Sequence, residues 1–87
     1  ISLMDGEVMA EPIKGTRKRA PNEEIDRLLR EELASSDKDR SENIMIVDLL
    51  RNDLSRVCDP NSMRVEQLCK VEEYPFVLHL VSVIGAR

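Results

Sequence analysis

The C-terminal part of the sequence contains two apolar runs that constrain the fold more than any other feature. Residues 63–71 and 76–84 carry apolar and β-branched side chains in alternation, and only residues 72–75 separate them. Such runs, divided by a short segment with a proline, are typical of β-strands. Strands joined by so short a connection run in opposite directions, because a parallel pair needs a long crossover. The sequence therefore predicts an antiparallel hairpin.

A second hairpin is predicted at the N-terminal end. Asp5 and Gly6 lie between two short alternating runs, and Asp-Gly in that position is the strongest short hairpin signal. Pro12 should close the second strand. We expect the basic residues that follow, with Gly15 among them, to form a connection that ends at Pro21.

Between the two hairpins the pattern changes to that of helices. Asn22 is a predicted N-cap of a helix that ends near Ser35, and Ser36 with Asp39 forms the cap pattern of a second helix that reaches about Val57. The predicted buried stripe of the first helix consists of Ile25, Leu28, Leu29 and Leu33. The second helix carries apolar residues on more than one face, so we expect it to be buried on most sides. The fold class is α+β, with two helices packed on one face of an antiparallel sheet.

Composition limits the classes of function. The chain has 87 residues, which suits one small domain, and its net charge of −4 argues against a nucleic-acid partner. No apolar run approaches the roughly 20 residues of a transmembrane helix, so we expect no membrane partner and a cytoplasmic protein. Cys58 and Cys69 lack CxxC spacing and only one histidine accompanies them, which favours reduced structural thiols over a zinc site.

Lys14 is the first candidate for chemistry. An amine becomes a nucleophile when burial or neighbouring groups lower its pKa from about 10.4. Lys14 follows a predicted strand end, where Gly15 would let the backbone approach a ligand and Thr16 would add a hydroxyl group. The alternative is a solvated basic connector that includes Arg17 and Arg19, and spacing alone favours this alternative.

Glu42 and Asp39 are the candidates for a metal site. They lie three residues apart on one face of the predicted second helix. Two carboxylates beside a cleft could hold Mg²⁺, a cation that prefers oxygen ligands. The alternative is ordinary charge at a helix N-terminus, paired with Lys38 or Arg40, and the spacing taken alone favours it.

Asp48 and His79 interrupt apolar runs. Isolated burial of a charge is costly, so we expect Asp48 to join a structural ion-pair network with Arg51, or one centred on Arg51 and Asp53. A lone histidine in an apolar strand is more often a satisfied core residue than a catalyst. The residues alone favour that interpretation of His79.

Three motifs follow one another along the chain, and they read PIKGTRKR, DKDRSENIMIVDLLRNDLSRVC and VEEYPFVLHLVS. Together they resemble the chorismate-utilising enzymes, a family that includes anthranilate, isochorismate, salicylate and aminodeoxychorismate synthases. The similarity to which these motifs belong covers nearly the whole chain. The resemblance implies that residues 1–87 are a central fragment of a catalytic domain, itself a larger chorismate-binding α/β sandwich. It also implies a transferase that acts on chorismate with Mg²⁺.

The position of Lys14 separates the branches of this family. Anthranilate and salicylate synthases typically carry alanine there, whereas lysine marks component I of the aminodeoxychorismate synthases, on the para-aminobenzoate branch that leads to folate. The resemblance implies that Lys14 attacks C2 of chorismate as the C4 hydroxyl leaves. Ammonia from a glutamine amidotransferase subunit or domain would then add at C4 and displace the lysine, which gives 4-amino-4-deoxychorismate.

The resemblance also implies roles for five further residues. Gly15 and Thr16 match a substrate-binding Gly-Thr pair, and His79 matches a histidine beside the substrate pocket. Glu42 matches a glutamate that coordinates Mg²⁺, and this metal anchors the ring carboxylate of chorismate. Asp39 falls where salicylate synthases carry a second glutamate near the metal.

The rest of the family's site is expected outside the chain. The general-acid glutamate should lie just upstream of Ile1, and a second Mg²⁺ glutamate and further chorismate contacts should lie beyond Arg87. We therefore expect a piece of a longer protein that is inactive alone. The rival interpretations are component I of an anthranilate synthase, which would release pyruvate, and a non-catalytic α+β module that binds a partner.

Overall fold

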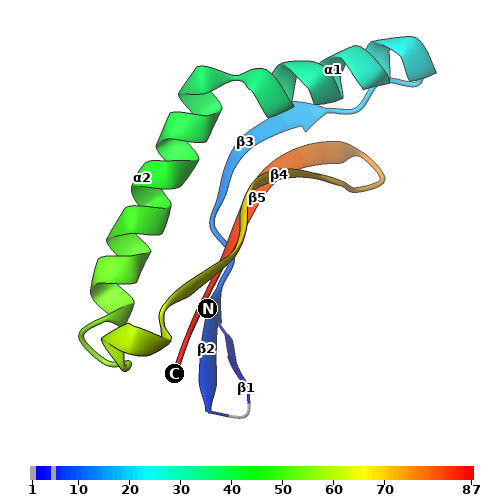
Figure 1. Cartoon of the computed structure of the whole chain (residues 1–87). Helices are drawn as coiled ribbons and strands as arrows, with labels where there is room; N and C mark the ends of the chain where they lie inside the picture. The colour runs from blue at the N-terminus through cyan, green and yellow to red at the C-terminus, as the bar shows by residue number, and fades with distance from the viewer. Residues whose placement is uncertain (1, 5) are drawn as a thin grey trace.

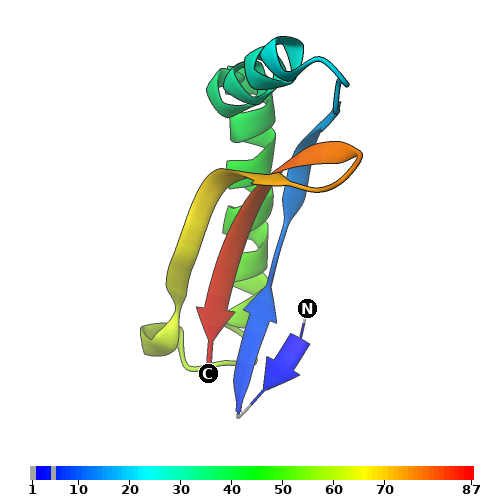
Figure 2. The same ribbon diagram turned by 90° about the vertical axis from the view of Figure 1, so that its right-hand side faces the viewer.

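The computed structural model describes residues 2–4 and 6–87. The elements, in chain order, are β1 (Ser2–Met4), β2 (Glu7–Ala10), β3 (Ile13–Lys18), α1 (Glu23–Ser35), α2 (Asp37–Leu54), a 3₁₀ turn (Pro60–Ser62), β4 (Arg64–Glu73) and β5 (Val77–Ala86). All strand pairs are antiparallel, and both helices lie on the same side of the sheet (Figures 1 and 2). The predicted α+β class, with two helices on one face, is confirmed.

The sheet is organised around β5, its central strand. Along one edge β5 pairs with β4, and along the other it pairs with β3 and then β2, while β1 pairs with β2 at the margin (Figure 2). Both predicted hairpins are present as β1–β2 and β4–β5, although Asp5 of the first turn lies outside the described residues. Since β5 contacts three other strands, its position determines where each of them lies.

The connection predicted from Gly15 to Pro21 is wrong in its first part, because residues up to Lys18 belong to the strand β3. Thr16, Arg17 and Lys18 pair with residues of β5. This segment carries basic residues and a glycine, so it lacks the alternation by which a strand is recognised in sequence. Its strand geometry comes from the hydrogen bonds offered by β5, which is distant in the chain.

Both helices begin where predicted and α1 ends at Ser35, but α2 ends at Leu54, short of the predicted end near Val57. The side chain of Asn22 accepts hydrogen bonds from the N–H groups of Glu24 (2.9 Å) and Ile25 (3.1 Å), and Ser36 caps the second helix. The helix faces differ from the predictions, because Ile25 and Leu28 are half exposed (50% and 51%). The prediction that α2 is buried on most sides is also wrong, since its outer apolar side chains are exposed (Ile44, Met45 and Leu49). One sheet layer can cover only one stripe of each helix.

The core lies between the helices and the sheet, in two apolar clusters. Leu33 of α1 packs with Cys69, Leu78 and Leu80, while Val47 of α2 packs with two residues of β2 and β5 (Ala10 and Ile84). Both cysteines are free thiols, as the sequence predicts. Within the described part of the chain, no helix is long and apolar enough to cross a membrane.

A polar contact also joins α2 to the sheet. The side-chain amide of Asn43, which is fully buried, donates to the carbonyl of Leu80 at 3.0 Å and accepts a hydrogen bond from the Ser82 hydroxyl. The same hydroxyl accepts the backbone N–H of Cys69, a residue with φ +51° at an irregularity of β4. A buried polar group destabilises the fold unless it is hydrogen-bonded. These hydrogen bonds therefore fix the position of α2 against β4 and β5.

Candidate functional site

Lys14 lies in an irregular part of β3. The register of β3 against β5 shifts between Ile13 and Thr16, and Gly15 has φ +113°. A Cβ at Gly15 would lie 3.0 Å from the Cβ of Asp39 and 3.1 Å from the Cβ of Leu80. The backbone of β3 therefore approaches the start of α2 directly beside Lys14, and Lys14 itself is exposed. The structure thus presents the lysine to solvent on a backbone held closely against the helices.

Thr16 and His79 are brought together on the other face of the sheet. They are register partners, and the Thr16 hydroxyl and Nδ1 of His79 are hydrogen-bonded at 3.0 Å. Leu78 and Leu80 point into the helix-side core, so alternation along β5 places His79 on the opposite face. Figure 2 shows both helices behind the sheet, with this face turned to the viewer. His79 is half-buried and hydrogen-bonded. His79 is therefore not enclosed in the core, although its apolar neighbours in the sequence predicted that it would be.

Several polar side chains lie near His79, and this arrangement was not predicted from the sequence. The ring of Tyr74 lies 5.3 Å from the His79 ring, and the Tyr74 hydroxyl donates to Glu72 at 2.9 Å. Hydrogen bonds from Gln67 and Tyr74 lower the pKa of Glu72 below its ordinary value of 4.5. The face that carries Thr16 and His79 therefore holds an ionised carboxylate at neutral pH. The only sequence feature that pointed to these side chains was the group of polar residues between the two predicted strands.

Glu42 and Asp39 differ in their surroundings although one turn of α2 separates them. Glu42 is exposed. The Asp39 side chain is only 14% exposed, and its Oδ2 accepts a hydrogen bond from Nη2 of Arg17 at 2.8 Å. Hydrogen bonds from the Ser36 hydroxyl and from Arg17 lower the pKa of Asp39. Asp39 is therefore an ionised group with an oxygen already bound, whereas Glu42 has its carboxylate available.

Of Glu42 and Asp39, only Glu42 is suited to bind Mg²⁺. Over residues 2–4 and 6–87, no three His, Cys, Asp or Glu side chains gather closely enough to hold a metal ion. Mg²⁺ is commonly held by one or two carboxylates together with water and substrate oxygens. An exposed glutamate suits such a partial site, and an aspartate paired with arginine does not.

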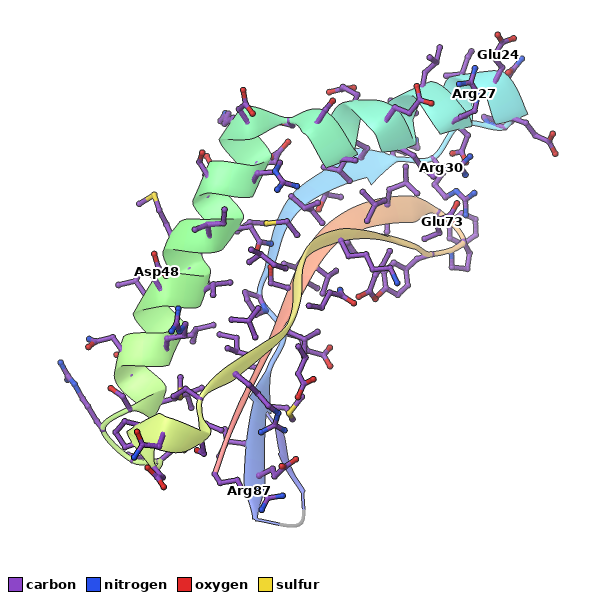
Figure 3. The ribbon with its side chains drawn as sticks, in the orientation of Figure 1. Glu24, Arg27, Arg30, Asp48, Glu73 and Arg87 are labelled. Atoms are coloured by element: carbon purple, nitrogen blue, oxygen red, sulfur yellow. The ribbon has the colours of Figure 1, made fainter. Side chains whose placement is uncertain are left out.

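The candidate residues thus divide between the two faces of the sheet. Gly15 and Asp39 meet on the helix side, and Thr16 and His79 meet on the open side. The predicted ion-pair network of Asp48 is wrong, because its members are exposed and form no ion pair in the described part of the chain; Asp48 is labelled on α2 in Figure 3.

Comparison with known proteins gives consistent similarities. The family model described as chorismate binding enzyme matches residues 1–87. The chain is 52% identical over its full length to aminodeoxychorismate synthase component 1 of Klebsiella aerogenes, of which it covers 19%. It is 46% identical over 86 residues to anthranilate synthase component 1 of Aquifex aeolicus, covering 98% of this chain and 17% of that protein.

A solved structure agrees with these sequence similarities. Anthranilate synthase component I from Streptococcus pneumoniae matches with a TM-score of 0.79 and 34% identity, over 98% of this chain and 18% of that one. The chain spans about a fifth of the length of the curated relatives it matches. Because the family model covers every residue of it, the chain belongs to the chorismate-binding enzyme family.

Proposed function

We propose that this chain is a segment of the catalytic domain of an aminodeoxychorismate synthase component I, a cytoplasmic enzyme of para-aminobenzoate and folate biosynthesis. The observation that carries the proposal is Lys14, an exposed lysine at the β3 irregularity. The similarity to the Klebsiella aerogenes protein supports it.

The proposed reaction uses Lys14 as a covalent nucleophile. The Nζ lone pair of the deprotonated amine forms a bond to C2 of chorismate, the two conjugated ring double bonds each shift by one position, and the C4–O bond breaks so that the hydroxyl leaves as water after protonation. Ammonia then forms a bond to C4, both double bonds shift back, and the C2–N bond breaks to release the lysine. No net oxidation or reduction occurs, and the ammonia would come from a glutamine amidotransferase subunit or domain.

Three further residues are proposed to bind the substrate. Gly15 offers backbone close to Lys14, while Thr16 and His79 form a hydrogen-bonded pair on the open sheet face. Polar groups held in place by one another are suited to orienting a substrate with carboxylate and hydroxyl groups. We propose that Glu42 holds Mg²⁺, which would fix the ring carboxylate of chorismate when bound.

The first prediction concerns the product and the lysine. A full-length enzyme carrying this segment, given chorismate, Mg²⁺ and an ammonium salt, should form 4-amino-4-deoxychorismate, identified by mass spectrometry. Lys14→Ala should lower the rate by roughly 100-fold or more, the scale on which loss of a catalytic side chain acts. Lys18→Ala is the matched control, because Lys18 is an exposed lysine of the same strand.

Two outcomes of this assay would contradict the proposal. Anthranilate as the sole product would assign the enzyme to the pyruvate-releasing branch, and no turnover of chorismate would favour the non-catalytic module. Undiminished amination by Lys14→Ala would remove the covalent role of the lysine while leaving the substrate assignment intact.

The second prediction concerns the metal. Glu42→Gln in the same enzyme should raise the Mg²⁺ concentration needed for half-maximal activity, since a neutral amide binds a hard cation more weakly than a carboxylate. Asp48→Asn is the control, because Asp48 is an exposed acid on the same helix. Equal Mg²⁺ requirements in the native enzyme and in Glu42→Gln would exclude Glu42 as the ligand.

A further inference from the structure

Arg17 is a second residue of β3 with an unusual set of contacts. Its guanidinium donates from Nη2 to Asp39 (2.8 Å), from Nε to Glu32 (3.0 Å) and from Nη1 to the carbonyl of Thr16 (2.9 Å). Glu32 belongs to α1 and Asp39 to α2, so one side chain connects β3 to both helices. Hydrogen bonds between ionised groups are stronger than neutral ones. The side chain is also mostly shielded, at 25% exposed.

Asp39 is held firmly from its own side. It is the third residue of α2, and its backbone N–H donates to the hydroxyl of the N-cap Ser36 at 3.3 Å. Its carboxylate accepts from Arg17, and the Ser36 and Arg17 hydrogen bonds lower its pKa below the ordinary value. The pair therefore joins a capped helix start to a strand, and neither partner can shift without breaking a charged contact.

The pair lies next to both groups proposed for chemistry. Gly15, the neighbour of Lys14, packs directly against the Asp39 side chain, as the 3.0 Å separation from a Cβ at position 15 shows. Glu42 follows Asp39 by three residues on α2, about one turn along the helix. The contact between Arg17 and Asp39 thus sets the distance between the part of β3 that carries Lys14 and the part of α2 that carries Glu42.

We propose that Arg17 and Asp39 are positioning residues, which hold Lys14 and Glu42 in their working relation by fastening β3 to the start of α2. The proposal rests on the function proposed above. It assigns the Asp39 carboxylate to Arg17 and not to the metal. A displacement of about 1 Å can cost roughly 100-fold in rate, so this contact is expected to affect catalysis without touching the substrate.

A double-mutant cycle in the full-length enzyme tests this. Arg17→Met and Asp39→Asn should each lower kcat by about 10- to 100-fold, and KM for chorismate should change less. The double variant should be no slower than the slower single variant, because both changes break the same contact. The matched control is Arg27→Met with Glu31→Gln, an exposed ion pair of α1 at 3.0 Å whose loss should leave kcat within twofold.

Several results would overturn the inference. The inference is wrong if kcat per folded enzyme stays within twofold of native in either single variant. It is also wrong if the decrease in kcat of the double variant is the product of the two single decreases. An increased Mg²⁺ requirement in Asp39→Asn but not in Arg17→Met would make Asp39 a metal ligand instead. If Asp39→Asn does not fold, Arg17→Lys replaces it, since lysine keeps the charge but cannot reach Asp39 and Glu32 with one planar group.

Hydrogen exchange separates this inference from the proposed function. Backbone amides of residues 13–18 should exchange faster in Arg17→Met and Asp39→Asn than in the native enzyme and the control pair, whether or not chorismate is the substrate. An unchanged exchange rate there would overturn the positioning role. Absence of amination by the native enzyme, with faster exchange in the variants, would overturn only the proposed function.

Discussion

At the scale of single residues, Gly15 satisfies two separate demands. Its φ of +113° is one that side chains rarely adopt, and the space where a Cβ would stand is filled by Asp39, Leu33 and Leu80. The sequence indicated a glycine that lets the backbone approach something closely. The structure identifies the neighbour as the junction of the two helices, so Gly15 serves packing as well as any contact with substrate.

The third prediction uses this residue. Gly15→Ala should destabilise the protein more than Gly6→Ala, measured as the midpoint of urea unfolding. Both changes place alanine at positive φ, which costs about 1–2 kcal/mol, but only position 15 is crowded, and overpacking adds about 1–3 kcal/mol. Gly6 has φ +77° with no atom within 4 Å of an added Cβ, which makes it the matched control. Equal midpoints for the two variants would show that the crowding is relieved without cost.

At the scale of elements, ion pairs fasten α1 to the end of the sheet. Asp26, only 5% exposed, accepts from Arg19 at 2.8 Å and from Arg30 at 3.4 Å. Arg30 also reaches Glu73 at 2.6 Å, and Figure 3 shows these two side chains between α1 and the β4–β5 hairpin. Arg19 donates to the carbonyl of Tyr74 as well. The buried Asp26 carboxylate thereby joins α1 to Arg19 in the connection after β3, and both arginines extend the contact to Glu73 of β4.

The fourth prediction follows from the charge of Asp26. The hydrogen bond from Arg19 lowers its pKa below the ordinary 3.8, despite the opposing effect of burial. A lowered pKa in the folded state means that the stabilisation is complete above about 3.8 and is lost as the pH falls through the lower folded value. Asp26→Asn should therefore be less stable than native at pH 7, and the difference should shrink below pH 4.

Unfolding curves at several pH values would check this, with Glu24→Gln as the control. Glu24 lies in the same first turn of α1 and is exposed (Figure 3). A difference between native and Asp26→Asn that stays constant from pH 7 to pH 3 would contradict a role for the charge.

The helices and hairpins were predictable from the sequence, whereas the strand β3 was not. The helices and both hairpins were recognisable because caps, periodicity and Asp-Gly are local signals, as at Asn22 and Ser36. β3 was missed because its strand state depends on pairing with β5, for example Thr16 with His79, whose separation in the chain is 63 residues. The same distance hid the contact of these two side chains.

At the scale of the whole molecule, a single helical layer covers a single sheet. This arrangement leaves large apolar side chains exposed on several elements, among them Met45 at 64%, Leu68 at 50% and Phe76 at 81%. The apolar side chains on the outside of α2 are exposed although apolar side chains are more often buried, which is why the prediction of a helix buried on most sides is wrong. Which helix face is covered depends on the layers present, and sequence periodicity does not report it.

The helices, the hairpins, the α+β class and the family are predictable from the order of the residues, since each rests on short-range patterns or on motifs that stay contiguous in the chain. The candidates Lys14 and Glu42 belong to those motifs. The pairing of Asp39 with Arg17 is visible only in the folded chain, because 22 residues separate the two and nothing local distinguishes one partner from another. Which charged side chains come into contact depends on how distant segments pair in the fold, and the order of residues along the chain does not specify those contacts.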